Sequence, residues 1–415
     1  APLSLFEDDR LCQDIGSQLD WDMVIIDEAH HLTGLGDTRS EFGQFIHDLS
    51  ARSRGLLLLS ATPEQAGLRN HFDRLQLIDP ARFADFDQFI EEHHQFATWS
   101  AKIEALEAGE DVALPPGIDA TADTDSKIEQ MLDRYGTSRI LYRNTRRGVT
   151  GFPTRHRYLY PLDNPTLYQQ STQQLHPELG KLESEWVTQD PRVAWLEAQL
   201  KSLRPQKALV ICAHIETAVA LEHYLHLKAG VRCAAFHEAL SLIERDRAAA
   251  YFAEESSGAQ ALICSEIGSE GRNFQFAQHL ICFDLPTHPD LLEQRIGRLD
   301  RIGQGSDIHI HVPYLTGTAQ ETLCRWLDEG LNAFSHTCSV GYQLFTDFSS
   351  QLADALCQPD QLQTLIEETR VCRDRLLEES EIGRDRLLER HSHDAVKGEA
   401  LIQSLIAREQ SDLLY

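Results

Sequence analysis

Residues 208–236 read ALVICAHIETAVALEHYLHLKAGVRCAAF, and this stretch decides the fold class. The apolar run 208–212 has the length and composition of a buried strand. Over residues 216–227 apolar side chains recur three and four positions apart, which predicts a helix. A second short apolar run, 231–236, predicts another strand. Because a helix between two short strands joins them in parallel, we expect an α/β fold built on a parallel sheet.

The same alternation continues on both sides of this unit. Further helices are expected over residues 193–203, 242–253 and 290–298, and further strands over residues 261–264, 280–283 and 308–312. Near the amino end, residues 22–26 and 56–59 read as two more buried strands, with a helix over residues 42–49 between them. Strands that alternate with helices at this spacing predict a doubly wound sheet.

Four segments follow from these patterns. Residues 1–84 hold the first α/β part, and residues 85–155 read as a helical linker or insertion. Residues 156–345 hold the second α/β part, and residues 346–415 form a charged helical tail. In this tail Arg-Asp-Arg-Leu-Leu-Glu occurs at residues 373–378 and again at 384–389. The offset of eleven keeps both copies near one helix face, so we expect a long helix or a helical hairpin.

Composition excludes several classes of protein. The chain has 415 residues, of which 42% are hydrophobic and 25% charged, as in soluble globular proteins. No apolar run is long enough to span a bilayer, so no membrane partner is expected. Nine cysteines without a CxxC pair predict small buried side chains in a reducing cytoplasm rather than disulfides or a structural metal. A net charge of −27 argues against non-specific coating of nucleic acid, but it allows contacts at a few sites.

Two arginines stand in the stretch QRIGRLDRIGQ, residues 294–304. Arg298 and Arg301 are three positions apart after an expected helix, and side chains at that spacing share a helix face. Two guanidinium groups there suit a triphosphate, because arginine stays charged and can donate two hydrogen bonds to phosphate oxygens at once. The alternative, for this segment alone, is an ordinary charged surface helix.

Adjacent carboxylates end the first expected strand. Asp27 and Glu28 would repel each other there unless a cation lies nearby. Mg²⁺ on a nucleotide suits this position, because it prefers one or two carboxylates together with phosphate oxygens and water. Asp27 would hold the hydrated metal, and Glu28 would orient and deprotonate the attacking water. His30 would link the state of the nucleotide to the second α/β part of the chain. The alternative is a solvated acidic turn.

Hydroxyl groups follow the second expected strand. Ser60 and Thr62 could bond the carboxylates and sense whether a γ-phosphate is present. The alternative is that Thr62 caps a helix whose first residue is Pro63.

Two later segments also lie at strand ends. Ser241 to Glu244 has the pattern of a capping box, and the free amides of such a helix start could also bind a backbone phosphate. Residues 265–273 form a loop with two glycines after an expected strand, and glycine permits close approach of the backbone to a ligand. This loop is interpreted as a coupling segment that faces both ATP and nucleic acid.

Taken in order, these motifs resemble the motor core of superfamily 2 helicases and translocases. The ending Arg301 to Gln304 and the basic stretch at residues 140–149, followed by Gly-Phe-Pro at 151–153, are similar to the Swi/Snf-type branch. Residues 143–146, 264–276 and 290–295 look like the RapA family of bacterial, RNA-polymerase-associated ATPases in that branch. The resemblance implies two RecA-like lobes, with residues 1–84 as the carboxyl-terminal part of the first and residues 156–345 as the second.

The resemblance also implies function. It implies ATP and Mg²⁺ as cofactors, double-stranded DNA and core RNA polymerase as partners, and translocation that helps to recycle the polymerase. It implies coupling roles for Glu270, Gly271 and Gln304 beside those of His30, Ser60 and Thr62. It implies weaker DNA contacts through Arg143, Arg146, Ser241, Ser265 and Arg272.

One feature of the family's pattern is missing from these residues. The sequence contains no GxxxxGK[ST], the loop that cradles phosphates, and the family carries it upstream of the strand ending at Asp27. We therefore expect a chain that begins inside the first lobe, hydrolyses little ATP by itself and leaves a sheet edge open. Two alternatives remain, a DEAH-type RNA helicase and an ATPase-dead scaffold that docks on polymerase.

Overall fold

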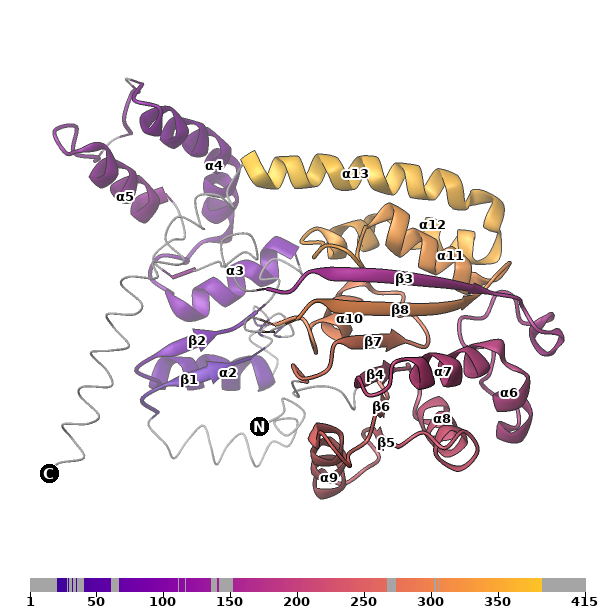
Figure 1. Cartoon of the computed structure of the whole chain (residues 1–415). Helices are drawn as coiled ribbons and strands as arrows, with labels where there is room; N and C mark the ends of the chain where they lie inside the picture. The colour runs from indigo at the N-terminus through magenta and orange to yellow at the C-terminus, as the bar shows by residue number, and fades with distance from the viewer. Residues whose placement is uncertain are drawn as a thin grey trace, which may run out of the picture. The chain divides into compact units, whose positions relative to one another are not determined.

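The computed structural model describes residues 21–27, 29, 32, 35, 41–60, 67–110, 112–115, 117–135, 140–141, 152–266, 274–301, 304 and 306–382. The chain divides into two compact units (Figure 1). One unit comprises Ala1–Gly148 together with Glu378–Tyr415, and the other comprises Val149–Leu377. Each unit is described separately below.

The second unit is built on a six-stranded sheet in which all neighbouring strands pair in parallel, as expected. Along the sheet the strands follow the order β3-β8-β7-β4-β6-β5. Their bounds are β3 Arg155–Leu162, β4 Ala208–Ile211, β5 Cys233–Phe236, β6 Ala261–Cys264, β7 His279–Cys282 and β8 Ile308–Leu315.

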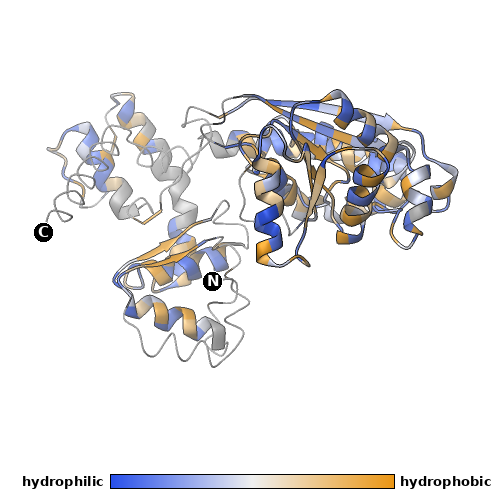
Figure 2. Ribbon diagram, turned by 60° about the horizontal axis from the view of Figure 1, so that its bottom comes forward, coloured by the Kyte–Doolittle hydropathy of each residue, from blue (hydrophilic) through white to orange (hydrophobic). Residues whose placement is uncertain are grey.

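Helices cover both faces of this sheet. The helices of one face are α9 Leu242–Ala253, α10 Pro289–Ile296, α11 Ala319–Arg325, the π-helical turn η5 Trp326–Gly330, α12 Gly341–Cys357 and α13 Leu362–Ile382. The helices of the other face are α6 Glu183–Gln189, α7 Pro191–Ser202 and α8 Ile215–Leu227. Two short 3₁₀ turns, η3 Thr166–Tyr168 and η6 Pro359–Gln361, lie in connections. Alternate residues of β4 and β6 enter the two separate cores, so the strands are apolar on both faces (Figure 2).

The strand order reverses at β4. This strand pairs with β6 on one side and with β7 on the other, although β5 and β6 both precede β7 in the chain. Connections that leave neighbouring strands in opposite directions open a crevice at their carboxyl ends, where α/β proteins place their ligands. In this unit those ends carry Cys212, Ser265 and Phe283, each directly after its strand.

The first unit contains two parallel strands, β1 Val24–Ile26 and β2 Leu56–Leu58, paired with Ile26 opposite Leu58. The helices α2 Glu41–Arg52 and α3 Gly67–Ile78 accompany them. One face of the two strands packs on a small core that includes Phe45 and Ile46. The other face leaves Ile25 and Leu57 58% and 39% exposed, although parallel strands usually bury both faces.

Residues 85–155 are largely helical where the structure describes them. They contain α4 Phe86–Glu107 and α5 Thr124–Tyr135, which share a small core around Ile103 and Met131. The expected helical tail is present as α12 and α13, which form two helices rather than one. The second copy of the six-residue repeat, residues 384–389, lies outside the described residues.

Two expectations about elements were wrong. The helix expected over residues 290–298 ends at Ile296, because the next residues form tighter turns in which the Leu299 amide bonds the Ile296 carbonyl. The strand β3 was not expected, because its sequence RHRYLYPL lacks a continuous apolar run. It forms at the edge of the sheet, where one side of a strand can remain polar.

Candidate functional site

The carboxyl ends of β1 and β2 bring Asp27 and Ser60 to one edge of the first unit. The Leu59 amide donates to the Ile26 carbonyl over 2.8 Å, and the Ala29 amide donates to the Leu59 carbonyl over 2.7 Å. Asp27 is exposed and Ser60 is half-buried. An exposed carboxylate beside a hydroxyl at a strand end fits a hydrated Mg²⁺, which keeps several of its waters.

Several predicted site residues lie outside the described residues. They are Glu28, His30, Thr62, Arg143, Arg146, Glu270, Gly271 and Arg272. Their assigned roles stay predictions.

Arg298 and Arg301 do not share a helix face, which corrects the sequence argument. Because α10 ends at Ile296, both residues lie beyond the helix. Arg298 is only 9% exposed, and its carbonyl accepts a hydrogen bond from the Phe274 amide. Arg301 is exposed, and its Nε donates to the Gly297 carbonyl over 3.0 Å.

The Arg298 guanidinium lies near the end of β6. Burial raises the pKa of the Cys264 thiol, against the opposing positive charge of Arg298. Gln304, also predicted as a coupling residue, is 9% exposed, and its side-chain amide donates to the Ala277 carbonyl over 3.1 Å. This contact gives Gln304 a local structural role.

Ser241 caps α9 as the capping box predicts. Its hydroxyl accepts from the Glu244 amide over 3.3 Å, and the Glu244 carboxylate accepts from the Ser241 amide over 2.9 Å. Ser265 is fully buried and its hydroxyl donates to the Glu238 carboxylate. That contact argues against a direct phosphate contact through Ser265, whereas Ser241 is exposed at the start of its helix.

A buried ionic network at the crevice was not predicted from the sequence. Arg295 on α10 is 1% exposed and its Nη1 donates to the Asp284 carbonyl over 2.6 Å. The same guanidinium bonds the Asp284 carboxylate, with Nη2 to Oδ1 at 3.1 Å, and the Glu266 carboxylate, with Nε to Oε1 at 2.9 Å. Asp284 follows β7 and Glu266 lies just beyond β6, so Arg295 ties α10 to the ends of two strands.

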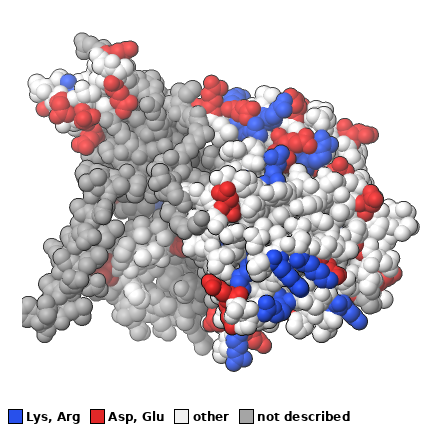
Figure 3. Space-filling view, in the orientation of Figure 1, with Lys and Arg blue, Asp and Glu red and all other residues white. Residues whose placement is uncertain are grey.

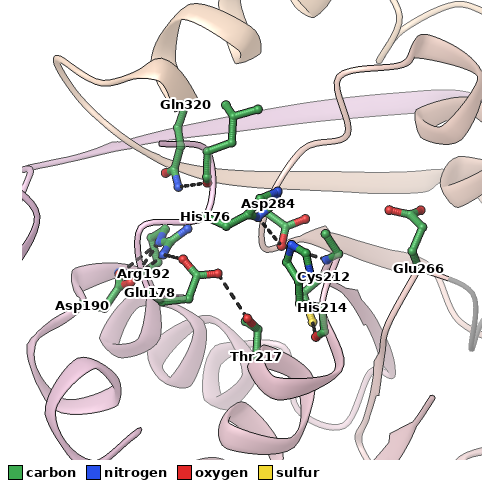
Figure 4. Close-up of polar contacts among 12 residues, drawn as sticks. His176, Glu178, Asp190, Arg192, Cys212, His214, Thr217, Glu266, Asp284 and Gln320 are labelled. Atoms are coloured by element: carbon green, nitrogen blue, oxygen red, sulfur yellow. Dashed lines mark hydrogen bonds and ion pairs between the residues drawn. The ribbon is translucent and has the colours of Figure 1, made fainter. Parts of the chain in front are cut away.

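Asp284 is also bound from the other side of the crevice (Figure 4). Its Oδ2 accepts from the Ala213 amide over 2.9 Å and lies 3.6 Å from Nδ1 of His176. Burial favours the neutral carboxyl, but His176 and Arg295 hold the pKa of Asp284 well below its ordinary value. Burial likewise opposes protonation of His176, yet Asp284 raises the pKa of this imidazole.

A second buried guanidinium group, that of Arg192, lies close to His176. Arg192 has no exposed surface, and its Nη2 reaches Oδ2 of Asp190 over 2.6 Å and Oε2 of Glu178 over 2.9 Å. Glu178 also accepts from the Thr217 hydroxyl over 3.2 Å. His176, Glu178 and Asp284 lie close enough to chelate a cation, but the guanidinium groups already neutralise both carboxylates, so these residues fit an ionic framework better than a metal.

One weak signal for this network was present in the sequence. Asp284 and Glu266 each lie within two residues of a strand end, and Arg295 lies in the same stretch as Arg298. Which carboxylates face Arg295 depends on the strand order, which the sequence did not supply.

Comparisons with protein families agree with this architecture. Residues 9–165 match a family described as the SNF2-related domain, and residues 191–303 match the helicase conserved C-terminal domain. These two domains define the ATPase core of SNF2-type proteins. Residues 307–415 match the C-terminal domain of the RNA polymerase recycling family. The three domains together identify the chain as a member of the RapA-type Swi/Snf ATPases.

Solved structures with similar folds include three chains of low sequence identity. The C-terminal part of the Fun30 ATPase domain is 17% identical, with a TM-score of 0.33, over 42% of this chain and 56% of that one. The Sulfolobus solfataricus SWI2/SNF2 ATPase core in complex with double-stranded DNA is 16% identical, with a TM-score of 0.37, over 85% of this chain and 75% of that one. The E. coli DEAD-box protein SrmB, bound to the regulator RraA, is 19% identical, with a TM-score of 0.30, over 39% of this chain and 77% of that one. The family assignment rests on the domain matches and not on these superpositions.

None of the described helices is both long and apolar enough to cross a membrane.

Proposed function

We propose that this chain is part of an ATP-driven translocase on double-stranded DNA that associates with core RNA polymerase and promotes its recycling. The observation that carries the proposal is the order of the three family domains, with Asp27 in the first and Arg298 and Arg301 in the second. Asp27 has the exposure and strand-end position that a metal-binding carboxylate needs.

The chemistry assigned to these residues is phosphoryl transfer to water. Bound ATP and Mg²⁺ would supply the phosphoryl group and neutralise part of its charge. Asp27 would orient the metal's waters, and Glu28 would accept the proton of the attacking water. Arg298 and Arg301 would stabilise the charge that develops on the transferred group.

Coupling and DNA contact are assigned to other residues. His30, Ser60, Thr62, Glu270, Gly271 and Gln304 would transmit the state of the nucleotide. DNA would be held by a few local contacts, namely the amides at Ser241 and the side chains of Arg143, Arg146 and Arg272. Such contacts would fix the backbone without reading sequence.

The charge pattern on the face drawn in Figure 3 fits a few local contacts. Figure 3 shows acidic and basic side chains interspersed over the visible face, with one area where Lys and Arg gather. With a net charge of −27, long-range attraction to DNA should be weak. Docking on RNA polymerase is supported by the family of residues 307–415.

Arginine substitutions in the full-length protein test the proposed function. Arg298→Ala and Arg301→Ala should each lower DNA-stimulated ATP hydrolysis by about 100-fold or more, because such arginines stabilise transferring phosphate. Arg325→Ala is the control, since Arg325 at the end of α11 pairs with Glu329 of η5, a contact outside this segment. The measurement is steady-state phosphate release with and without duplex DNA, together with a circular dichroism spectrum of each variant.

The outcomes separate the alternatives. Near-normal turnover in both variants would remove the phosphate role of these arginines. Stimulation by RNA with strand displacement would favour an unwinding RNA helicase. Absence of hydrolysis in the full-length protein, with polymerase binding unchanged by Glu28→Gln, would favour a scaffold.

A further inference from the structure

The side chain of Arg155 joins two points of the segment that carries Arg298. Arg155 is the first residue of β3, and its side chain is 2% exposed. Its Nε lies 2.5 Å from Oδ2 of Asp300. Its two terminal nitrogens donate to both oxygens of Glu293, at 2.9 and 2.5 Å.

Glu293 and Asp300 enclose the end of α10. Glu293 lies in the helix, Arg298 lies two residues after its last residue, and Asp300 lies two residues further on. The bidentate contact fixes the orientation of the helix, since a planar guanidinium must face the carboxylate edge-on. The contact with Asp300 then fixes the position of the turn that follows. Arg155 therefore holds the backbone of Arg298 from both sides.

Arg295 holds the same segment from the strand ends. It bonds Asp284 and Glu266, as described above, and it lies between the two residues that Arg155 binds. Within the described residues the segment is thus anchored to β3 through one buried guanidinium and to the ends of β6 and β7 through another. Apolar packing also holds this segment, since Leu292, Ile296 and Leu299 are buried in the core, and the Phe274 amide donates to the Arg298 carbonyl over 3.2 Å.

We propose that Arg155 is a positioning residue that holds the segment from Glu293 to Asp300, so that Arg298 and Arg301 stay placed for the transferred phosphate. The inference rests on the proposed function for its chemical consequence. Its structural part, that Arg155 orders this segment, stands independently.

The chain supplies a matched control two residues away. Arg157 also lies on β3, and its Nε lies 2.5 Å from Oδ1 of Asp328, a carboxylate that is 7% exposed. This pair anchors β3 to η5 and does not contact the segment of Arg298. Arg157→Met removes an ion pair from the same strand, at a side chain that is 46% exposed where that of Arg155 is 2% exposed. Only Arg155→Met is expected to disturb the segment of Arg298.

The experiment compares these variants in the full-length protein. For Arg155→Met we expect a kcat for DNA-stimulated ATP hydrolysis lowered by about 10-fold or more, because placement of a charged group is a transition-state effect. The KM for ATP should change by less than about threefold. Amide hydrogen exchange over residues 297–301 should become at least about 10-fold faster, with β4 and β6 unchanged. Arg157→Met should leave the kcat and this exchange within about twofold of the wild-type values.

Other variants keep the inference open to contradiction. Arg155→Lys retains the charge but loses the planar guanidinium that binds both oxygens of Glu293, and it should give intermediate values of kcat and of the exchange rate. If Arg155→Met does not fold, Asp300→Asn removes the charge of one of the two carboxylates that Arg155 binds and should still speed exchange at residues 297–301. Wild-type exchange and kcat in a folded Arg155→Met protein would overturn the inference. A wild-type protein without DNA-stimulated hydrolysis would contradict the proposed function instead, and the exchange measurement would still decide whether Arg155 orders the segment.

Discussion

At the scale of single residues, three buried arginines determine the local geometry of the second unit. Arg155, Arg192 and Arg295 each face two carboxylates, and each has a side chain at most 2% exposed. Removing a charge from water costs several kcal/mol, and the attraction of a well-aligned partner only offsets that cost. These groups therefore specify which elements meet more than they add net stability.

Loss of Arg192 should be strongly destabilising. In Arg192→Leu the carboxylates of Asp190 and Glu178 would remain buried without their partner, which costs about 3–5 kcal/mol. Urea unfolding followed by tryptophan fluorescence measures the loss. The control is Lys201→Leu, because Lys201 pairs with Glu197 at an exposed position and should contribute less than about 1 kcal/mol. A loss of unfolding free energy below about 1 kcal/mol in Arg192→Leu would show that the ion pairs of Arg192 with Asp190 and Glu178 are dispensable.

At the scale of elements, the neighbouring strands β3, β8 and β7 at one end of the sheet carry an unusual set of rings. His279 on β7 and His309 and His311 on β8 stack with 4.9 and 5.3 Å between ring centroids. Tyr158 on β3 stacks on His311 at 5.1 Å, and the His279 and His311 nitrogens lie 3.0 Å apart. These residues occupy the sheet face that α7 and α8 cover elsewhere. Tyr158 is 41% exposed at the sheet edge, whereas His279 and His311 are buried. The ring nitrogens of these two histidines are hydrogen-bonded to each other, to Gln206 and to Tyr160.

This ring cluster should make the second unit sensitive to mild acid. Burial and the neighbouring His309 lower the pKa of His279 to about 4, and burial with His279 and His309 lowers that of His311 to about 3. Below about pH 6.5 these two histidines bind protons in the unfolded chain but stay neutral in the folded unit. The free energy of unfolding should therefore fall as the pH drops from about 6.5 to 5. The expected loss is roughly 1.5 kcal/mol for each of these two histidines, or about 3 kcal/mol together. It is partly offset by His176, whose raised pKa acts with the opposite sign.

Urea unfolding at about pH 5 and pH 7 tests this sensitivity. The loss of stability on acidification should be smaller in His279→Asn, because one of the histidines that resist protonation is gone. Equal pH dependence in the variant and the wild-type protein would assign the acid sensitivity to other groups.

At the scale of the whole molecule, the second unit has the properties of an independent domain. Its sheet has helices on both faces, and both of its apolar cores lie within Val149–Leu377. The helix α13 completes one of them, since Leu365 and Ile366 are buried and the Trp326 indole donates to the Thr369 hydroxyl over 3.0 Å. The small first unit instead leaves one face of β1 and β2 exposed.

A fragment of residues 149–377 should fold by itself. We expect one cooperative thermal transition within about 5 °C of the matching transition in the whole chain, because no core residue is lost. A fragment of residues 149–357 lacks α13 and should unfold at a clearly lower temperature. Calorimetry of both fragments provides the measurement. A fragment 149–377 without a cooperative transition would show that the unit depends on other parts of the chain.

The sequence by itself determined the α/β class, the parallel sheet and most of the elements of the second unit. Apolar runs and helical spacing are local signals, so helices such as Leu242–Ala253 were predicted to the residue. The capping box at Ser241 was predicted for the same reason. The motifs at Asp27 and Arg298 could be found because they lie at the ends of such elements.

Only the tertiary structure decided which charges meet. Arg155 is 138 residues from Glu293 and 145 from Asp300, and no local pattern connects them. The burial of Arg298, the exposure of Arg301 and the edge strand β3 likewise depend on the strand order β3-β8-β7 and on where α10 ends. Helical spacing predicts a shared face only for residues within the helix, and Arg298 and Arg301 lie beyond its end. The contacts that hold the following turn come from distant strands.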